Sequence, residues 1–177
     1  MDIVISASFG VNLGNEEEGI EKIIQKDMQG KISGGGYIWK GNLQTPIRIN
    51  ASKTDGTLIG SMALSPEPLV YEDEKVNSLY IAGTIVDPEF QKMGISREMF
   101  GYAHEHAKGH DTFHSFVGET NEKSLDSRKA MGFKVEEEGT FRACFFRVDP
   151  DIATKTLDEM KPRVVRLVRK SELVMTR

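Results

Sequence analysis

The most informative part of this chain is residues 85–96, which read IVDPEFQKMGIS. The pattern predicts an apolar strand that ends at Val86, a turn that contains Pro88, and a helix that begins at Gly94. The first turn of such a helix leaves backbone N–H groups unpaired beside the positive end of the helix dipole, and both features suit a pyrophosphate. Gly94 would let the backbone approach the phosphates, and the small Ser96 would keep that approach open. Taken alone, these residues predict a generic anion site.

Strand and helix patterns alternate on both sides of this stretch. On its N-terminal side the spacing of apolar residues predicts a strand up to Phe9, a helix over 16–28, and strands over 37–51, 57–64 and 78–86. On its C-terminal side it predicts a helix over 94–108, a strand over 112–117, a helix over 121–131, and strands over 134–138 and 141–148. Asp55-Gly56 predicts a hairpin turn, whereas residues 65–75, which are rich in proline and acids, are predicted as a loop.

This order of elements predicts a single α/β domain with a mixed, mostly antiparallel sheet flanked by helices. The run of strand, helix, strand and helix over 78–131 is expected to form a right-handed crossover unit. We assign residues 1–160 to the domain and residues 161–177 to a basic amphipathic C-terminal extension of the same domain. In a helix, the extension would place apolar and basic side chains on opposite faces: Val164, Val165, Leu167 and Val168 against Arg163, Arg166, Arg169 and Lys170. Such a helix either packs on its own domain or binds a partner.

The composition is that of a globular protein, with 38% hydrophobic residues, 28% charged residues and a formal net charge of -4. Nucleic-acid binding needs a concentrated basic face, so this charge argues against it, and the acidic stretch 67–74 favours a cationic ligand. No window approaches the roughly 18 apolar residues that a membrane helix needs, and residues 1–6 lack the features of a signal peptide. We therefore expect a cytoplasmic protein that binds neither nucleic acid nor membranes.

Neither the histidines nor the cysteine predict a metal site. Four histidines lie close together in the sequence, but no carboxylate accompanies them at a recurring ligand spacing: His104, His106, His110 and His114. Cys144 is the single cysteine of the chain, so it is expected to be a reduced, structural thiol. We predict no metal cofactor.

Two segments resemble the signatures of the GNAT superfamily of N-acetyltransferases. Val86-Asp87-Pro88 followed by Gln91-Lys92-Met93-Gly94-Ile95-Ser96 resembles its motif A, a Gln/Arg-x-x-Gly-x-Gly/Ala signature after a strand that ends in Val-x-Pro. Ser96 stands where Gly or Ala is commoner. The helix that opens at Asn121 and closes on Gly132-Phe133 resembles the second signature. Because both signatures occur at the right separation, the chain is identified as a member, and the specific resemblance covers roughly 79–134.

The resemblance implies that the chain binds acetyl-coenzyme A (acetyl-CoA) as a cosubstrate. The strand to Val86 would splay from the strand over 113–117, which gives a V-shaped opening between the two central parallel strands. The resemblance further implies that Ile85 and Val86 offer backbone groups to pantetheine and that Asn121 touches it from the opposite wall. It assigns the pyrophosphate to Gln91, Lys92, Met93, Gly94, Ile95 and Ser96. The nearest basic side chains for the ribose phosphate are Lys92, Arg97, Lys123 and Arg128.

The catalytic residues depart from those of many relatives. The tyrosine that protonates the departing thiolate in many relatives is replaced here by Arg128, which stays protonated and could stabilise the thiolate or bind phosphate instead. The glutamate often found six residues before Val86 is replaced by Tyr80. We therefore take Tyr80 and Glu119 as the candidates for proton handling. His114 lies on the strand that lines the opening, and by parity it faces either the opening or a covering helix.

These observations predict an acetyl-CoA-dependent N-acetyltransferase that moves the acetyl group to a primary amine by direct attack in a ternary complex. The acceptor would be a small molecule or a protein amine, and a homodimer is left open. Cys144 lies outside both signatures, so no acetyl-cysteine is expected. The alternative is a non-catalytic acyl-CoA-binding sensor or interaction module, because the usual tyrosine and glutamate are absent.

Overall fold

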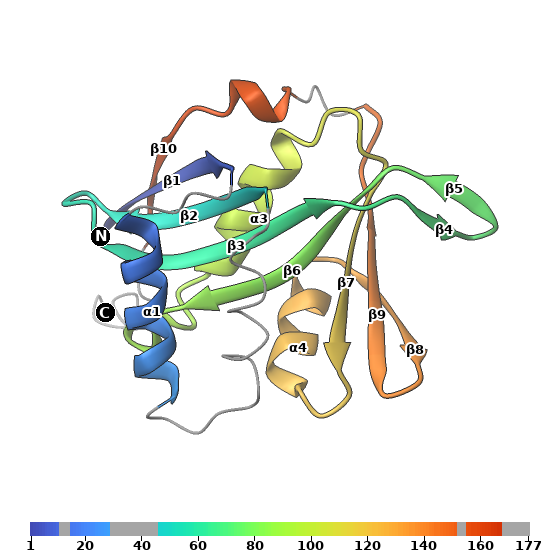
Figure 1. The fold of residues 1–177 in the computed structure, drawn as a ribbon, viewed down its shortest axis with the longest axis horizontal. Coiled ribbons are helices and arrows are strands. Elements are labelled where there is room, and N and C mark those ends of the chain that lie inside the picture. The colour runs from blue at the N-terminus through green and yellow to red at the C-terminus, as the bar shows by residue number, and fades with distance from the viewer. Residues whose placement is uncertain (11–14, 29–45, 152–154, 168–177) are drawn as a thin grey trace, which may run out of the picture.

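The computed structural model describes residues 1–10, 15–28, 46–151 and 155–167, which build an eight-stranded sheet and a separate two-stranded hairpin (Figure 1). The large sheet has the strand order β10-β1-β2-β3-β6-β7-β9-β8. Among these described strands, β6 and β7 are the one parallel pair. The strands are β1 (Asp2–Phe9), β2 (Ile47–Lys53), β3 (Leu58–Pro66), β6 (Ser78–Val86), β7 (Thr112–Gly118), β8 (Lys134–Glu138), β9 (Phe141–Arg147) and β10 (Arg163–Arg166). The predicted mixed, mostly antiparallel sheet is confirmed.

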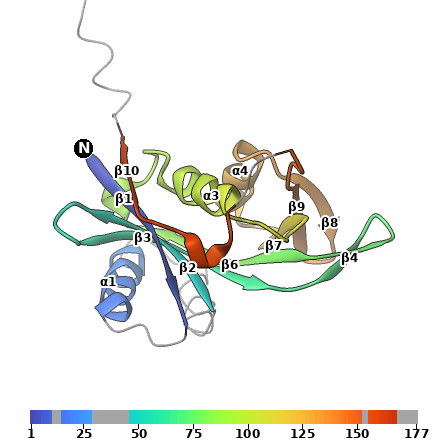
Figure 2. The same ribbon diagram turned by 90° about the horizontal axis from the view of Figure 1, so that it is seen from above.

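Helices cover both faces of this sheet (Figure 2). Helix α1 (Asn15–Met28) lies on one face, and α3 (Ile95–Glu105) and α4 (Glu122–Ala130) lie on the other. Helix α3 carries the chain from β6 to its parallel neighbour β7, which is the predicted crossover. All three helices match the sequence patterns, although α3 ends at Glu105, three residues before the predicted end.

The hydrophobic core lies mainly between the sheet and α3. Apolar side chains of alternate strand positions meet the buried face of the helix there, and Phe113 contacts Phe100 edge to face with ring centroids 5.1 Å apart. On the other face, Ile20 and Ile24 of α1 form a smaller cluster with Ala63 of β3. The fully buried side chains of the main core include Ile3, Ile5, Met62, Leu64, Leu79, Met99, Tyr102 and Phe113. This packing holds the C-terminal end of β6 and the start of α3 in a rigid frame.

Residues 65–75, predicted as a loop, instead contain a hairpin of β4 (Leu69–Tyr71) and β5 (Glu74–Val76). Its turn places Glu72 at φ 50° and Asp73 at φ 64°, and two successive left-handed residues are what a two-residue hairpin turn requires. The prediction was wrong because Glu72 takes a conformation that usually favours Gly, Asn or Asp, so the turn left no recognisable dipeptide.

The helix predicted for the C-terminal extension is also wrong over its described part. Residues Arg163–Arg166 form β10, which pairs antiparallel with the edge strand β1, so that Val165 packs on the core and Val164 is exposed. A four-residue apolar and basic run fits either period, and the open edge of β1 decides in favour of the strand. The predicted positions Val168, Arg169 and Lys170, like residues 37–45 of the predicted strand 37–51, lie outside the described residues. Within the described ranges, no helix is long and apolar enough to cross a membrane.

The segment before β10 is held to α3 by a buried tyrosine, which gives a first prediction. The hydroxyl group of Tyr102, whose side chain is fully buried, donates to the backbone carbonyl of Lys161. We expect Tyr102→Phe to lower the free energy of unfolding by about 1 kcal/mol, because the hydrogen bond is lost while the packing of the ring is kept. Urea denaturation of both proteins measures the change, and equal midpoints would show that the hydrogen bond does not hold this segment.

Candidate active site

The two parallel strands β6 and β7 pair only at their first residues. Ser78–Tyr80 pair with Thr112–His114, and beyond that point the two strands do not pair with each other and diverge, as Figure 1 shows. A register shift against β3, where Leu64 lies opposite Ile81 and Ala63 lies opposite Gly83, marks a β-bulge in this part of β6. A bulge bends its strand and increases the local twist, which accounts for the divergence. We call the region between the diverging strands the splay. Its closed end lies at Tyr80 and His114, where the pairing stops, and its open end lies at the C-terminal ends of both strands.

The loop that follows β6, residues 87–94, presents backbone groups at the open end of the splay. Asp87 caps a short 3-10 helix, η1 (Pro88–Phe90), and accepts from the Glu89 backbone N–H at 3.1 Å. Lys92 and Gly94 both have left-handed backbone conformations, with φ 66° and φ 86°, and α3 begins directly after Gly94. Apart from the residues next to Gly94 in the chain, no heavy atom of the described residues lies within 4 Å of the position that a Cβ of Gly94 would take. The loop therefore leaves open space beside the first turn of a helix, as an anion site needs.

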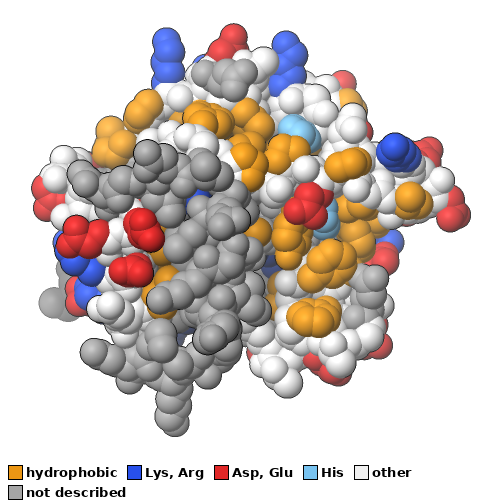
Figure 3. Space-filling view, in the orientation of Figure 1, with side chains coloured by type: hydrophobic (Ala, Val, Ile, Leu, Met, Phe, Trp, Pro, Cys, Tyr) orange, Lys and Arg blue, Asp and Glu red, His pale blue; other side chains and the backbone are white. Residues whose placement is uncertain are grey.

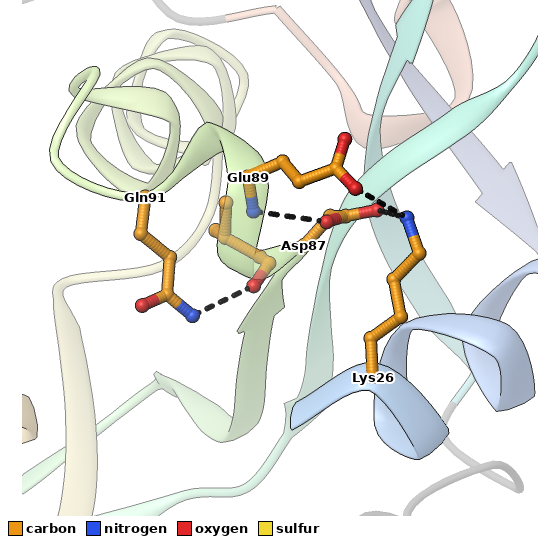
Figure 4. Close-up of polar contacts among 5 residues, drawn as sticks. Lys26, Asp87, Glu89 and Gln91 are labelled. Carbon is orange, nitrogen blue, oxygen red and sulfur yellow. Dashed lines mark hydrogen bonds and ion pairs between the residues drawn. The ribbon is translucent and has the colours of Figure 1, made fainter. Parts of the chain in front are cut away.

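An ion pair ties this loop to α1 (Figure 4). The Lys26 Nζ lies 2.7 Å from Oδ2 of Asp87 and 3.5 Å from Oε1 of Glu89. Asp87 is buried, and its hydrogen bond raises the pKa of Lys26. The contact therefore links α1, on one face of the sheet, to the loop that leads from β6 to α3 on the other face.

Gln91 and Asn121, two residues predicted to hold the cofactor, organise the open end of the splay. The Gln91 side chain donates to the carbonyl of Val86 at 3.1 Å, as Figure 4 shows, and accepts from Lys123 Nζ at 2.6 Å. Lys123 belongs to the first turn of α4, so this hydrogen bond links the loop after β6 to the helix after β7. Asn121 is the N-cap of α4 and accepts from the Ser124 backbone N–H at 3.2 Å. Contacts of both side chains to a cofactor stay a prediction.

The other predicted cofactor residues separate into core and surface positions. Ile95 is the first residue of α3 and its side chain is buried in the main core, Ile85 packs toward α1, and Val86 and Met93 pack against the main core. Because all four side chains are apolar, any hydrogen bond that these residues make to a ligand comes from their backbone groups. Ser96 follows in the first turn of α3, at the end of the loop.

Arg128 lies in the closed part of the splay, between β6 and β7. Its Nε donates to Ser115 Oγ of β7 at 3.0 Å, and its Nη2 donates to Thr84 Oγ1 of β6 at 3.4 Å. The residue is 6% exposed, and the guanidinium also lies over the Phe133 ring at 5.7 Å. Burial lowers the pKa of Arg128 to about 10, so the group is a cation at neutral pH. Among the described residues no carboxylate lies within ion-pair distance of it.

The structure separates the two residues predicted to handle protons, Tyr80 and Glu119. Tyr80 lies at the closed end, half-buried, with its ring 5.1 Å from that of His114. Glu119 is exposed and follows β7 at the open end, five residues after His114, which corresponds to roughly 16 Å of extended chain. The structure therefore does not bring the two together.

A further acidic residue, Glu67, lies near Tyr80 and was not identified as a candidate for proton handling from the sequence. Its backbone N–H donates to the Ser78 carbonyl, which continues the ladder in which Ser65 lies opposite Tyr80. Burial raises the pKa of Tyr80, the negative charge of Glu67 raises it further, and Arg128 opposes this. Only the pairing of β3 with β6 brings Glu67 within electrostatic reach of Tyr80, so no local sequence signal could have identified it.

His114 is buried on the face of β7 opposite to Phe113, beside Tyr80 and the exposed Phe116. The open question of its orientation is therefore settled against the covering helix α3, beneath which Phe113 packs. The His114 Nδ1 lies 2.7 Å from Ser78 Oγ. Burial lowers the pKa of His114 to about 4, so the imidazole is neutral at pH 7.

The depressed pKa of His114 predicts acid sensitivity. Between pH 7 and 5 the unfolded chain protonates this imidazole while the folded chain does not, so the free energy of unfolding falls with pH, by about 2 kcal/mol for this group. We expect His114→Asn to remove this part of the slope in urea titrations. Burial also lowers the pKa values of His104 and His110, so the variant should keep a smaller dependence of unfolding free energy on pH. An unchanged slope in the variant would assign the acid sensitivity to other groups.

Cysteine and metal chemistry find no support among the residues that the structure describes. Within them, no group of three histidine, cysteine or acidic side chains is arranged to hold a metal ion. Cys144 is fully buried in β9, and burial raises the pKa of its thiol. A buried thiol is a poor nucleophile, as expected for a structural cysteine.

Near the closed end, the β4–β5 hairpin and the β8–β9 hairpin enclose a hollow of about 420 Å³. Tyr71 stacks on Phe145 there with ring centroids 4.4 Å apart. The hollow is also lined by the acids Glu72, Glu136 and Glu137. Figure 3 shows hydrophobic side chains gathered on one face of the molecule, with acidic side chains among and beside them. The large hydrophobic residues that are exposed include Val70, Phe116 and Phe141.

Comparison with known proteins gives a match to one family model, described as the acetyltransferase (GNAT) family, over residues 30–133. The matched interval contains β6, the 87–94 loop, α3, β7 and α4, the elements that form the splay. No curated protein matches the chain.

Solved structures with the same fold are distant in sequence. An acetyltransferase of the GNAT family from Listeria monocytogenes is 15% identical over 81% of this chain and 94% of its own, with a TM-score of 0.58. The ribosomal-protein-S18-alanine N-acetyltransferase from Escherichia coli is 13% identical over 82% and 94%, with a TM-score of 0.56. The NatC complex bound to Gag peptide and CoA contains a chain that is 16% identical over 82% and 99%, with a TM-score of 0.56. At these identities the likeness shows the fold.

Proposed function

The chain belongs to the acetyltransferase (GNAT) family, and we propose that it transfers the acetyl group of acetyl-CoA to a primary amine by direct attack in a ternary complex. Membership supports acetyl transfer from acetyl-CoA in general. The observation that carries the proposal for this chain is the splay, which opens beside the 87–94 loop and closes at Tyr80. A pantetheine arm would enter at the loop and lie along the diverging edge of β6, as an added strand does.

The phosphates would lie over the residues around Gly94, and the thioester would lie toward the closed end. Backbone N–H groups in the part of β6 that does not pair with β7, which ends at Ile85 and Val86, would polarise the thioester carbonyl. The amine nitrogen then attacks the carbonyl carbon, the C–S bond breaks, and its electron pair stays on sulfur. Before the attack the bound ammonium loses one proton to become a neutral amine, and as the amide forms the nitrogen loses a second proton to a base on the acceptor side. The buried Cys144, with its raised pKa, supports a mechanism without an acetyl-cysteine.

The acceptor is proposed to be a cationic amine, either a small molecule or the amino group of a protein. Three acids line the hollow next to the closed end: Glu72, Glu136 and Glu137. Acidic walls raise the local concentration of a protonated amine, and the aromatic pair of Tyr71 and Phe145 offers it an apolar surface. The structural likeness to an enzyme named ribosomal-protein-S18-alanine N-acetyltransferase is compatible with the second class.

The proposal is tested in one preparation with two measurements. Calorimetry measures acetyl-CoA binding, and thiol release is then followed against polyamines, aminoglycosides and peptides with free N-termini. Binding together with release for one amine class would establish the enzyme and identify its acceptor class. Binding without release from any amine would favour the alternative, an acyl-CoA-binding sensor. No binding would overturn both.

A further inference from the structure

Arg128 carries a positive charge that no carboxylate in the described part of the chain neutralises. It is 6% exposed, it donates to two neutral hydroxyl groups, and among the described residues no carboxylate pairs with it. Burying a cation without an anion is costly, and an apolar side chain of similar size would pack at this place with less cost. A structural role alone therefore does not account for this arginine.

Its position also argues against a role at the phosphates. Helix α4 runs along the splay from the open end, where Lys123 contacts Gln91, to the closed end, where Arg128 contacts Ser115. Lys123 and Arg128 are five residues apart, roughly 7.5 Å along the helix axis. The lysine is thus the basic residue next to the 87–94 loop, whereas the arginine lies deeper, where the far end of a pantetheine arm would lie.

We propose that Arg128 binds the sulfur of coenzyme A as a thiolate, and that this fixed cation takes the place of a proton donor when the thioester breaks. The inference rests on the proposed function. In the step, the C–N bond forms, the C–S bond breaks, and the electron pair remains on sulfur opposite the guanidinium. The proton lost by the amine goes to a base on the acceptor side and then to water, so no acid is needed for the leaving group.

This assignment makes a prediction about free CoA that needs no turnover. A cation at contact distance lowers the pKa of an acid by about 1–3. With a lowering of about 2, bound CoA would lose its thiol proton in the range pH 6–9, and its affinity would rise on the order of 20-fold across that range. The groups facing Arg128 from the neighbouring strands, Tyr80 and Cys144, stay neutral there because burial raises the pKa of both.

The experiment compares CoA with desulfo-CoA, which lacks the sulfur, by calorimetry between pH 6 and 9. In the unmodified protein we expect the ratio of the two affinities to rise on the order of 20-fold with pH. Arg128→Gln should remove this rise, and Lys129→Gln, which removes an exposed charge from the same helix, should keep it. The thiolate absorbance of bound CoA gives an independent reading of the same titration.

Each outcome decides the inference. A ratio that does not change with pH in the unmodified protein would overturn the role of Arg128 while leaving the proposed function intact, because both ligands would still bind. Failure of both ligands to bind would overturn the proposed function and the inference with it. If Arg128→Gln does not fold, the unmodified protein still gives the ratio, and Arg128→Lys, which keeps the charge, should retain part of the rise.

Discussion

Replacing Gly94 by glutamate is expected to weaken acetyl-CoA binding by at least 100-fold. Gly94 has φ 86° and open space where its side chain would extend, so a carboxylate introduced there would lie over the first turn of α3. Two like charges about 4 Å apart near a protein surface repel by about 4 kcal/mol. The new charge would therefore exclude the pyrophosphate from the loop.

A matched control separates this effect from backbone strain. Gly109 also has a left-handed backbone, at φ 83°, and also has open space around its Cβ position, but it follows the opposite end of α3. We expect Gly94→Glu and Gly109→Glu to lose similar stability, about 1 kcal/mol each, because a side chain is disfavoured at positive φ. Only the first should lose binding in calorimetry.

Two results would contradict this placement of the phosphates. Equal losses of binding in both variants would mean that strain, not charge, is responsible. Normal binding by a folded Gly94→Glu variant would mean that the cofactor does not use the 87–94 loop, and the site would have to lie elsewhere in the splay.

The features predicted from the sequence are those that depend on neighbouring residues. The strand to Val86, Gly94 at the start of a helix and Asn121 at the start of another are local patterns, since a breaker or cap acts on the residues beside it. The family resemblance predicted that the two central parallel strands splay apart, and the short register of β6 with β7 confirms this divergence.

The features that were missed depend on contacts between distant segments. The C-terminal run Arg163–Arg166 forms a strand because the edge of β1 is open, which no short-range pattern reveals. Glu67 lies near Tyr80 because β3 pairs with β6, and Arg128 is buried because α4 crosses behind both diverging strands. The sequence indicates which residue types are present, whereas the pairing of strands decides which charges act on one another.

The second large effect concerns the base that accepts the proton of the amine. We expect Glu67→Gln to lower kcat by about 10²-fold with little change in the KM for acetyl-CoA, as loss of a general base does. Glu67 raises the pKa of Tyr80 and Arg128 lowers it, so a carboxylate and a cation both lie within electrostatic reach of Tyr80 at the closed end. The amine would lose its proton toward Glu67, while the thiolate would form toward Arg128.

Replacing Tyr80 and replacing Glu119 are expected to change kcat to different extents in the same assay. Because the pKa of Tyr80 is raised above its usual value of 10, the hydroxyl is protonated at neutral pH and can position a water or the amine but cannot accept a proton. We expect Tyr80→Phe to lower kcat by about tenfold.

Glu119→Gln removes the same charge as Glu67→Gln, but from the open end of the splay, and we expect a change in kcat within about twofold, since general base catalysis requires contact or a single bridging water. Steady-state kinetics of the three variants with one acceptor distinguishes the two carboxylates. If Glu119→Gln lost about 10²-fold and Glu67→Gln did not, the base would belong to the loop after β7. The acceptor would then have to enter beside α4 and not beside the β4–β5 hairpin, because the attacking nitrogen must lie next to the group that takes its proton.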